Sequence, residues 1–181
     1  MPESGERERG AGGAPGPGIA IRAAQEDDLT GLLAIYNEVI AFSTAVFSEE
    51  PVTLDDRRRW LEARREHGYP VLVAVDATGV AGFGSFGEFR GWAGYRFTVE
   101  HSVHVRVDRR GEGIGTAIVA ALIEHAIALG KHCMVAGVEA GNTASLRLHE
   151  RLGFEQVALM REVAWKFERW LDLIFLERLL P

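Results

Sequence analysis

Arg110-Gly111-Glu112-Gly113-Ile114-Gly115 separates a segment that alternates like a strand (97–107) from an apolar segment with helical character (116–129). A strand that enters a helix through glycines leaves backbone N–H groups without partners at the positive end of the helix. Glycine also permits positive φ and close approach of a ligand to the backbone. The turn is therefore suited to a phosphate or a pyrophosphate.

The two common phosphate-binding motifs do not fit this turn. Gly111, Gly113 and Gly115 have the spacing G-x-G-x-G, whereas the dinucleotide fingerprint requires G-x-G-x-x-G. A Walker loop requires four residues between its glycines and then Gly-Lys-Ser/Thr, which the segment lacks. Spacing alone also leaves open a strand-to-helix turn that binds no ligand.

Hydrophobic periodicity predicts the elements on both sides of the turn. Further strands are predicted over 19–23, 71–75, 80–88, 132–138, 154–163 and 165–176, and further helices over 28–37, 53–67 and 143–152. The resulting order β, α, α, β, β, β, α, β, α, β, β indicates a mixed α/β domain that is neither doubly wound nor a barrel. The arginine-rich face of the helix over 53–67 contains interspersed acids, and we interpret it as a solvated face.

Composition narrows the class of protein. The 181 residues carry a formal charge of −6, which argues against a nucleic-acid binder. The single cysteine, Cys133, excludes an internal disulfide and a cysteine-based zinc cluster, and a reducing cytoplasm is the expected location. No apolar run approaches the roughly 18 residues of a membrane span. Residues 1–18 hold six of the 21 glycines and three of the six prolines, so we expect a flexible tail followed by one domain over 19–181.

A second segment, Asn142-Thr143-Ala144-Ser145-Leu146-Arg147-Leu148-His149-Glu150-Arg151-Leu152-Gly153-Phe154, resembles the C-terminal signature of the GNAT superfamily of N-acetyltransferases. The glycine turn resembles the R/Q-x-x-G-x-G pyrophosphate loop of the same superfamily, and both motifs stand at the expected places in the element order. The resemblance implies a mixed, mostly antiparallel central sheet of about seven strands flanked by about four helices. It also implies acetyl-CoA as the co-substrate.

Shorter segments resemble one subfamily, the phosphinothricin and methionine sulfoximine N-acetyltransferases. They are Ile35-Tyr36-Asn37, Gly68-Tyr69-Pro70-Val71-Leu72-Val73-Ala74, Phe89-Arg90, Gly94-Tyr95-Arg96, Thr98-Val99-Glu100-His101-Ser102-Val103 and Lys166-Phe167-Glu168-Arg169-Trp170-Leu171-Asp172. This resemblance implies transfer of acetyl from acetyl-CoA to the α-amine of a small glutamate-like amino acid. It also implies a homodimer, with the acceptor site near the dimer interface.

Two residues are the candidates for catalysis. Glu100 is the only acid in the strand over 97–107, and a positioned carboxylate can take the proton that the amine must lose. The resemblance implies that Glu100 is the general base and that His149 is a proton donor or a second base. An exposed strand carboxylate and a helix-surface histidine are the alternatives. His101 lies on the face opposite Glu100 and is not assigned to the site, and no His, Asp or Glu grouping has metal-ligand spacing.

The remaining candidates are assigned to the two ligands. For acetyl-CoA the resemblance implies contacts from Val103, Val105, Arg110, Gly111, Gly113, Ile114, Gly115, Thr116, Asn142 and Ser145. For the acceptor the candidates are Phe42, Thr44, Arg90, Tyr95, Arg96 and Thr98, with the two guanidinium groups suited to a carboxylate. Glu112 departs from the superfamily pattern. Its carboxylate would oppose a diphosphate, and Arg109 and Arg110 are expected to offset this negative charge.

Other functions fit the same resemblance. The acceptor can be another amino acid, a polyamine or a protein N-terminus, although paired arginines favour an acidic amino acid over a polyamine. A non-catalytic acyl-CoA-binding module is the alternative outside enzymes. The presence of Glu100 and His149 argues against such a module, which would need neither.

Overall fold

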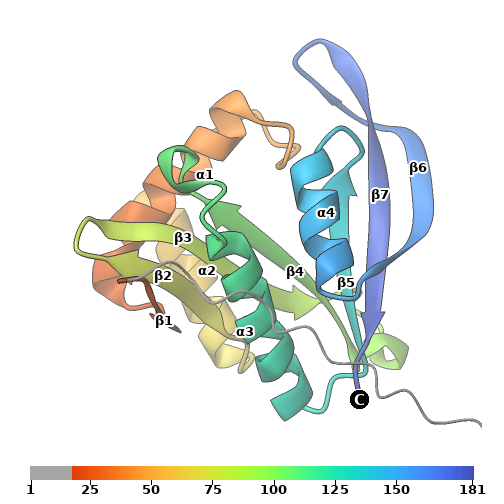
Figure 1. Ribbon diagram of the computed structural model, residues 1–181, viewed down its shortest axis with the longest axis horizontal. Coiled ribbons are helices and arrows are strands. Elements are labelled where there is room, and N and C mark those ends of the chain that lie inside the picture. The colour runs from red at the N-terminus through yellow and green to blue at the C-terminus, as the bar shows by residue number, and fades with distance from the viewer. Residues whose placement is uncertain (1–17) are drawn as a thin grey trace, which may run out of the picture.

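A seven-stranded sheet in the order β1-β2-β3-β4-β5-β7-β6 forms the centre of the computed structural model, which describes residues 18–181 (Figure 1). The strands are β1 (Ala20–Ala23), β2 (Val71–Asp76), β3 (Gly79–Glu88), β4 (Thr98–Val105), β5 (Cys133–Glu139), β6 (Glu155–Lys166) and β7 (Arg169–Leu179). All neighbours pair antiparallel except β4 and β5, which are parallel. The predicted mixed, mostly antiparallel sheet is confirmed. The predicted tail over 1–18 lies outside the described residues, except for Gly18.

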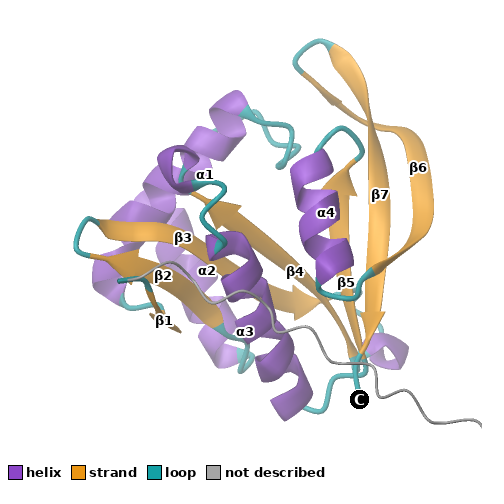
Figure 2. Ribbon diagram, in the orientation of Figure 1, coloured by secondary structure: helices purple, strands orange, loops and turns teal. Residues whose placement is uncertain are grey.

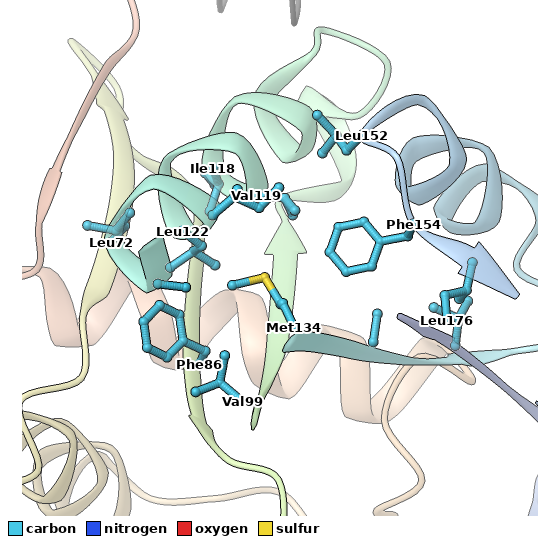
Figure 3. Close-up of a cluster of buried hydrophobic side chains, with 14 of the residues drawn as sticks. Leu72, Phe86, Val99, Ile118, Val119, Leu122, Met134, Leu152, Phe154 and Leu176 are labelled. Atoms are coloured by element: carbon cyan, nitrogen blue, oxygen red, sulfur yellow. The ribbon is translucent and has the colours of Figure 1, made fainter. Parts of the chain in front are cut away.

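Helices cover both faces of this sheet (Figure 2). They are α1 (Leu29–Phe42), α2 (Leu54–Glu66), α3 (Ile114–Ala128) and α4 (Thr143–Arg151), with short 3₁₀ turns η1 (Glu26–Asp28), η2 (Ala93–Tyr95) and η3 (Val107–Arg109). On one face, α1 and α2 pack on Val71, Val73 and Phe83. On the other, α3 packs on residues that alternate with these, such as Leu72 and Ala74. Figure 3 shows Leu122, Met134 and Phe154 in this second core.

Several element boundaries differ from the predicted ones. Helix α1 ends at Phe42 instead of 37, because Val39 and Ile40 continue its buried stripe. Helix α3 begins at Ile114, directly after the last positive-φ glycine of the turn. The turn between β6 and β7 lies at Phe167 and Glu168 instead of residue 164, since these two residues carry no glycine or proline that would mark it.

The parallel strands β4 and β5 diverge along their length (Figure 1). They pair only from Thr98 opposite Cys133 to His101 opposite Ala136. Beyond this point β4 continues to Val105 while paired to β3, and β5 continues to Glu139 while paired to β7. The facing edges of β4 and β5 therefore have no strand between them, and they form a wedge-shaped opening in the middle of the sheet.

Candidate active site

The wedge between β4 and β5 holds a small cavity of about 80 Å³. Its lining residues are Ala45, His101, Ser102, Val103, His104, Ala136, Gly137, Val138, Glu139, Asn142, Ser145 and His149. Four residues predicted for the site from distant segments, at positions 103, 142, 145 and 149, thus meet at one place. A larger groove of about 830 Å³ lies between α1 and the β2–β3 hairpin, but no predicted site residue lines it, and its two arginines, Arg22 and Arg106, are held in ion pairs within the chain.

The glycine turn lies beside the wedge, at the N-terminus of α3. Gly111 and Gly113 have φ of 85° and 79°, a left-handed conformation that other residues rarely adopt, and both positions are open to solvent. The first amides of α3 have no partner within their helix, so they are available to an anion. Gly115 has another role, because a Cβ there would lie 3.0 Å from Leu148 Cδ1 of α4. It permits α3 and α4 to pack closely.

Two arginines and one glutamate set the charge around the turn. The Arg109 guanidinium pairs with Asp76 and also with Glu112, at 2.9 Å from Oε2. Arg109 is therefore held by two carboxylates, so it offsets the charge of Glu112 as expected but is not itself available to a diphosphate. The same contact places a cation against Glu112. Arg110 donates to the Val105 carbonyl at 3.3 Å and has no carboxylate partner among the described residues, so it is the cation that stays available.

Glu100 is half-buried on β4, on the face opposite His101 as the alternation predicts. Burial raises the pKa of its carboxyl group, and the charge of Arg90 opposes this shift. Its Oε1 lies against Gly137 of β5, where a Cβ would come within 3.3 Å of it. Gly137 thus leaves the space in which the carboxylate lies. A carboxylate with a raised pKa in a partly desolvated position is a suitable general base near neutral pH.

His149 of α4 is only 2% exposed, so the alternative of a helix-surface histidine is wrong. Its Nδ1 lies 2.7 Å from the Ser145 carbonyl oxygen, which only accepts, so Nδ1 carries the proton. Its Nε2 lies 3.1 Å from Nε2 of His101, a residue that sequence analysis left out of the site. With both imidazoles neutral, His101 Nε2–H donates to the lone pair of His149 Nε2, and His101 Nδ1 is a buried acceptor without a partner.

Burial keeps this histidine pair neutral. It lowers the pKa of His101 to about 3, with a further contribution from His149. It also lowers the pKa of His149, although the bond to the Ser145 carbonyl opposes the shift. The alternation along β4 indicated the correct face for His101. Nothing in the sequence indicated that α4 would bring His149 against it.

The β5–α4 junction adds a carboxylate that sequence analysis missed. Glu139 is 9% exposed and lines the wedge. Its Oε1 accepts from the Gly141 amide and its Oε2 from the Thr44 hydroxyl, each at 2.9 Å. An acid directly after a buried strand was the available signal, but the predicted strand ended one residue earlier. Asn142 caps α4 by accepting from the Ser145 amide at 3.2 Å, which leaves its amide NH₂ group free for another contact.

The structure brings only some of the predicted acceptor residues to the site. Thr44 bonds Glu139, and the charge of Arg90 acts on Glu100. Arg96 instead stacks on Phe97, 4.5 Å from the ring centroid, and donates to the Ala93 carbonyl. The others occupy separate positions: Phe42 is 84% exposed at the end of α1, Tyr95 packs on Phe89, and Thr98 begins β4.

The arginine-rich face of α2 is not fully solvated as expected. Arg57 is buried, with its guanidinium 4.2 Å from the Tyr36 ring centroid and 5.0 Å from that of Trp60. Stacking on aromatic rings allows a guanidinium to be buried without a carboxylate partner. Arg58 and Arg59 follow the expectation, because both are paired to acids near the helix start.

Two further observations concern the part of the chain that the structure describes. None of its helices is both long and apolar enough to cross a membrane. Within residues 18–181, no three His, Cys, Asp or Glu side chains are grouped as a metal site would require.

Comparison with known proteins agrees with this geometry. Residues 32–154 match the model of the acetyltransferase (GNAT) family. The L-methionine sulfoximine/L-methionine sulfone acetyltransferase of Pseudomonas paraeruginosa is 52% identical over 159 residues, which cover 87% of this chain and 92% of that protein. The phosphinothricin N-acetyltransferase of Streptomyces coelicolor is 36% identical over 88% of this chain and 95% of its own.

A solved structure extends the comparison to the fold. The protein yncA from Salmonella typhimurium, determined with its cofactor acetyl-CoA, superimposes with a TM-score of 0.89. It is 43% identical, over 91% of this chain and 95% of that one.

Proposed function

Because this chain belongs to the GNAT family of acetyltransferases, we propose that it transfers acetyl from acetyl-CoA to the α-amine of a small glutamate-like amino acid, of the methionine sulfoximine, methionine sulfone or phosphinothricin type. The observation that carries this proposal is the wedge, in which His149 lines the opening beside the unpaired edge of β4 and Glu100 lies against Gly137 of the same lining. The identity of 52% to a methionine sulfoximine/sulfone acetyltransferase supports the acceptor class. We assign the activity to one domain over 19–181.

Acetyl-CoA fits the residues beside the wedge. The amides from Gly111 to Thr116 and the guanidinium of Arg110 would hold its diphosphate, since both are free of competing carboxylates. The open edge of β4 at Val103 and Val105, together with Asn142 and Ser145, would hold the pantetheine arm. When bound, acetyl-CoA supplies an acetyl thioester, whose carbonyl carbon is the electrophile and whose thiol is the leaving group.

Glu100 is the proposed base. An α-amine of pKa about 8 is neutral for only about a tenth of molecules at pH 7, which costs about 1.4 kcal/mol before any bond forms. Glu100 would take the proton from the ammonium group, directly or through water, and the raised pKa of its carboxyl group favours this transfer. Removal of the proton leaves the lone pair of the amine free to attack.

His149 is assigned to the leaving-group side of the wedge. Of the two roles that the resemblance implies, a second base is disfavoured because the lone pair on Nε2 already accepts from His101. Donation toward the leaving thiolate is disfavoured as well, because the neutral ring has one proton, which Nδ1 donates to the Ser145 carbonyl. The thiolate would instead take the second proton that the amine loses after its attack, and His149 would orient the groups on this side of the wedge.

Arg90 is the proposed contact for the anionic end of the acceptor. Its charge already acts on Glu100, so an amino acid whose α-amine lies at Glu100 would bring a carboxylate within reach of the guanidinium. Thr44 and Glu139 would border the same pocket. Phe42, Tyr95, Arg96 and Thr98 remain candidates for the outer part of the acceptor site.

We also propose a homodimer and a cytoplasmic location. Strand β6 is at the sheet edge and exposes a row of apolar side chains, an arrangement that favours pairing with another surface. These side chains are Val157, Leu159, Met160, Val163 and Trp165. Light scattering at several protein concentrations measures the mass, and a monomer at all of them would contradict the dimer.

A panel of acceptors tests the proposed function. The release of CoA thiol is followed with methionine sulfoximine, methionine sulfone, phosphinothricin, neutral amino acids, a polyamine and a peptide with a free N-terminus. We expect the highest kcat/KM with the first three compounds. A preference for the polyamine or the peptide would show that the enzyme acts on another class of acceptor. Tight CoA binding without turnover of any amine would indicate a binding module.

A further inference from the structure

The segment Lys166–Asp172 resembles the subfamily, but no step of the proposed function uses it. In the structure this segment forms the tip of the β6–β7 hairpin, and Lys166 is the last residue of β6. Its side chain is 0% exposed although it carries an ammonium group. Such a group is seldom fully buried unless it has partners. Its surroundings therefore indicate what the residue does.

The Lys166 ammonium group has three partners, all of them backbone carbonyls. Nζ lies 2.7 Å from the carbonyl oxygens of Ile40, Ser43 and Val46. An ammonium group has three N–H donors, whereas a neutral amine has two, so three carbonyl acceptors require the charged form. Burial lowers the pKa of Lys166, and the charge of Glu49 opposes this shift.

The partners of Lys166 belong to the end of α1 and to the loop that follows it. Ile40 is in the last turn of α1, where carbonyls lack helical partners and the helix dipole is negative. Ser43 and Val46 are in the loop over 43–48. One side chain from β6 thus binds a helix end and a loop that are more than one hundred residues away in the sequence. In Figure 1 the β6–β7 tip and the end of α1 extend to the same end of the molecule as the start of α4.

The hairpin turn beside Lys166 is strained. Phe167 and Glu168 form a two-residue turn with φ of 53° and 56°, in the left-handed region that favours glycine or asparagine. Strained turns persist where surrounding contacts offset their cost. The three bonds of Lys166 and the position of its Nζ, 4.8 Å from the Phe167 ring centroid, are such contacts. The turn conformation and the burial of Lys166 are therefore linked.

The loop over 43–48 borders the wedge. The Thr44 hydroxyl donates to Glu139 at the end of β5, and Ala45 lines the cavity. The loop is therefore fastened at two sides, by Lys166 of the hairpin and by Glu139 of the sheet. The residues proposed for acetyl-CoA lie on β4, on the glycine turn and at the start of α4, and none of them is a partner of Lys166.

We propose that Lys166 is a positioning residue for the acceptor, which holds the loop over 43–48 against the wedge so that the acceptor pocket is formed before the amino acid enters. The proposal rests on the proposed function for the identity of the acceptor. Without the ammonium group, three buried carbonyls lose their donors and the loop moves to reach water. The acceptor pocket is then no longer formed, while the residues proposed to bind acetyl-CoA keep their positions.

The variant Lys166→Met tests this proposal, because methionine keeps the apolar stem and removes the donors. Arg169→Met is the matched control, since Arg169 pairs with Lys166 across the hairpin but has an exposed side chain that makes no hydrogen bond among the described residues. We expect Lys166→Met to raise the KM for methionine sulfoximine about tenfold or more, with the KM for acetyl-CoA within about twofold of wild type. We expect both constants to be unchanged in Arg169→Met.

Hydrogen exchange of the backbone amides gives a second readout that needs no turnover. We expect faster exchange over 43–48 in Lys166→Met and unchanged exchange over 111–116. If Lys166→Met does not fold, Lys166→Gln is the second variant, because glutamine keeps two N–H donors. We expect Lys166→Gln to raise the KM for methionine sulfoximine by a smaller factor and to leave the KM for acetyl-CoA unchanged.

Three results would overturn the proposal. The first is an unchanged acceptor KM in a folded Lys166 variant, and the second is an equal rise of both KM values. The third is unchanged exchange over 43–48. If the wild-type protein acetylated no amino acid, the proposed function would fail, and the exchange rates would still decide whether Lys166 holds the loop.

Discussion

Replacing the Glu100 carboxylate with an amide gives the sharpest prediction about the chemistry. Glu100→Gln keeps the size of the side chain, and Gly137 of β5 already leaves the space that the side-chain end occupies. The Glu100 carboxyl group makes no ion pair with any residue from 18 to 181, so we expect the fold to be unchanged. The variant therefore isolates the proton acceptor.

The magnitude follows from the role of a general base. Such a residue contributes about 10²- to 10⁴-fold to the rate, which corresponds to about 3 to 5 kcal/mol of barrier. We expect kcat and kcat/KM for the acceptor to fall by this factor, with little change in the KM for acetyl-CoA. Because burial raises the pKa of Glu100, the wild-type rate should fall as pH decreases through that raised pKa, and the variant should lack this acidic limb.

The assay is the initial rate of CoA thiol release between about pH 6 and pH 9, at saturating acetyl-CoA. Glu88→Gln is the control, because Glu88 is an exposed glutamate at the end of the neighbouring strand β3. We expect wild-type rates from this control at every pH. Wild-type rates from Glu100→Gln over the same range would refute the assignment of the base.

Three further predictions concern the charges and histidines. Glu112→Lys adds a cation beside the proposed diphosphate site, while Arg109 keeps its ion pair with Asp76. We expect the KM for acetyl-CoA to fall about two- to fivefold. An unchanged KM would show that the side chain at position 112 points away from the phosphates. Nitrogen NMR should find both members of the histidine pair neutral at pH 7, His101 protonated on Nε2 and its partner on Nδ1, and the reverse arrangement or a cationic ring would contradict the tautomers. Buried His101 and His104, with pKa values lowered to about 3 and about 4, bind protons only in the unfolded chain below about pH 6.5. Each of these histidines should therefore lower the free energy of unfolding by about 1.4 kcal/mol for each pH unit from about 6.5 down to about 4, and urea unfolding of His104→Phe should show a slope smaller by one such contribution.

The sequence predicted the features that depend on local patterns. The glycine turn, its place between a strand and a helix, and the succession of helices and strands along the chain all follow from residues that are close together in the sequence. The face of Glu100 also follows, because alternation fixes the side of a strand on which each residue lies.

The missed features depend on contacts between distant segments. His101 meets His149 only because α4 packs on that face of the sheet, and Lys166 meets the end of α1 across more than one hundred residues. The second partner of Arg109, Asp76 of β2, was missed for the same reason. The turn at Phe167 and Glu168 carries no turn residues, and tertiary contacts of the neighbouring lysine offset its strain.

The central claim is that an acetyl group passes directly from acetyl-CoA to the α-amine of an amino acid in the wedge. One measurement tests it most directly: NMR of a reaction that contains isotope-labelled acetyl-CoA and methionine sulfone, read together with the thiol released. We expect one labelled amide on the α-nitrogen for each thiol released, and loss of this signal in Glu100→Gln. Thiol release without an amide, or a label that ends on the protein, would contradict it.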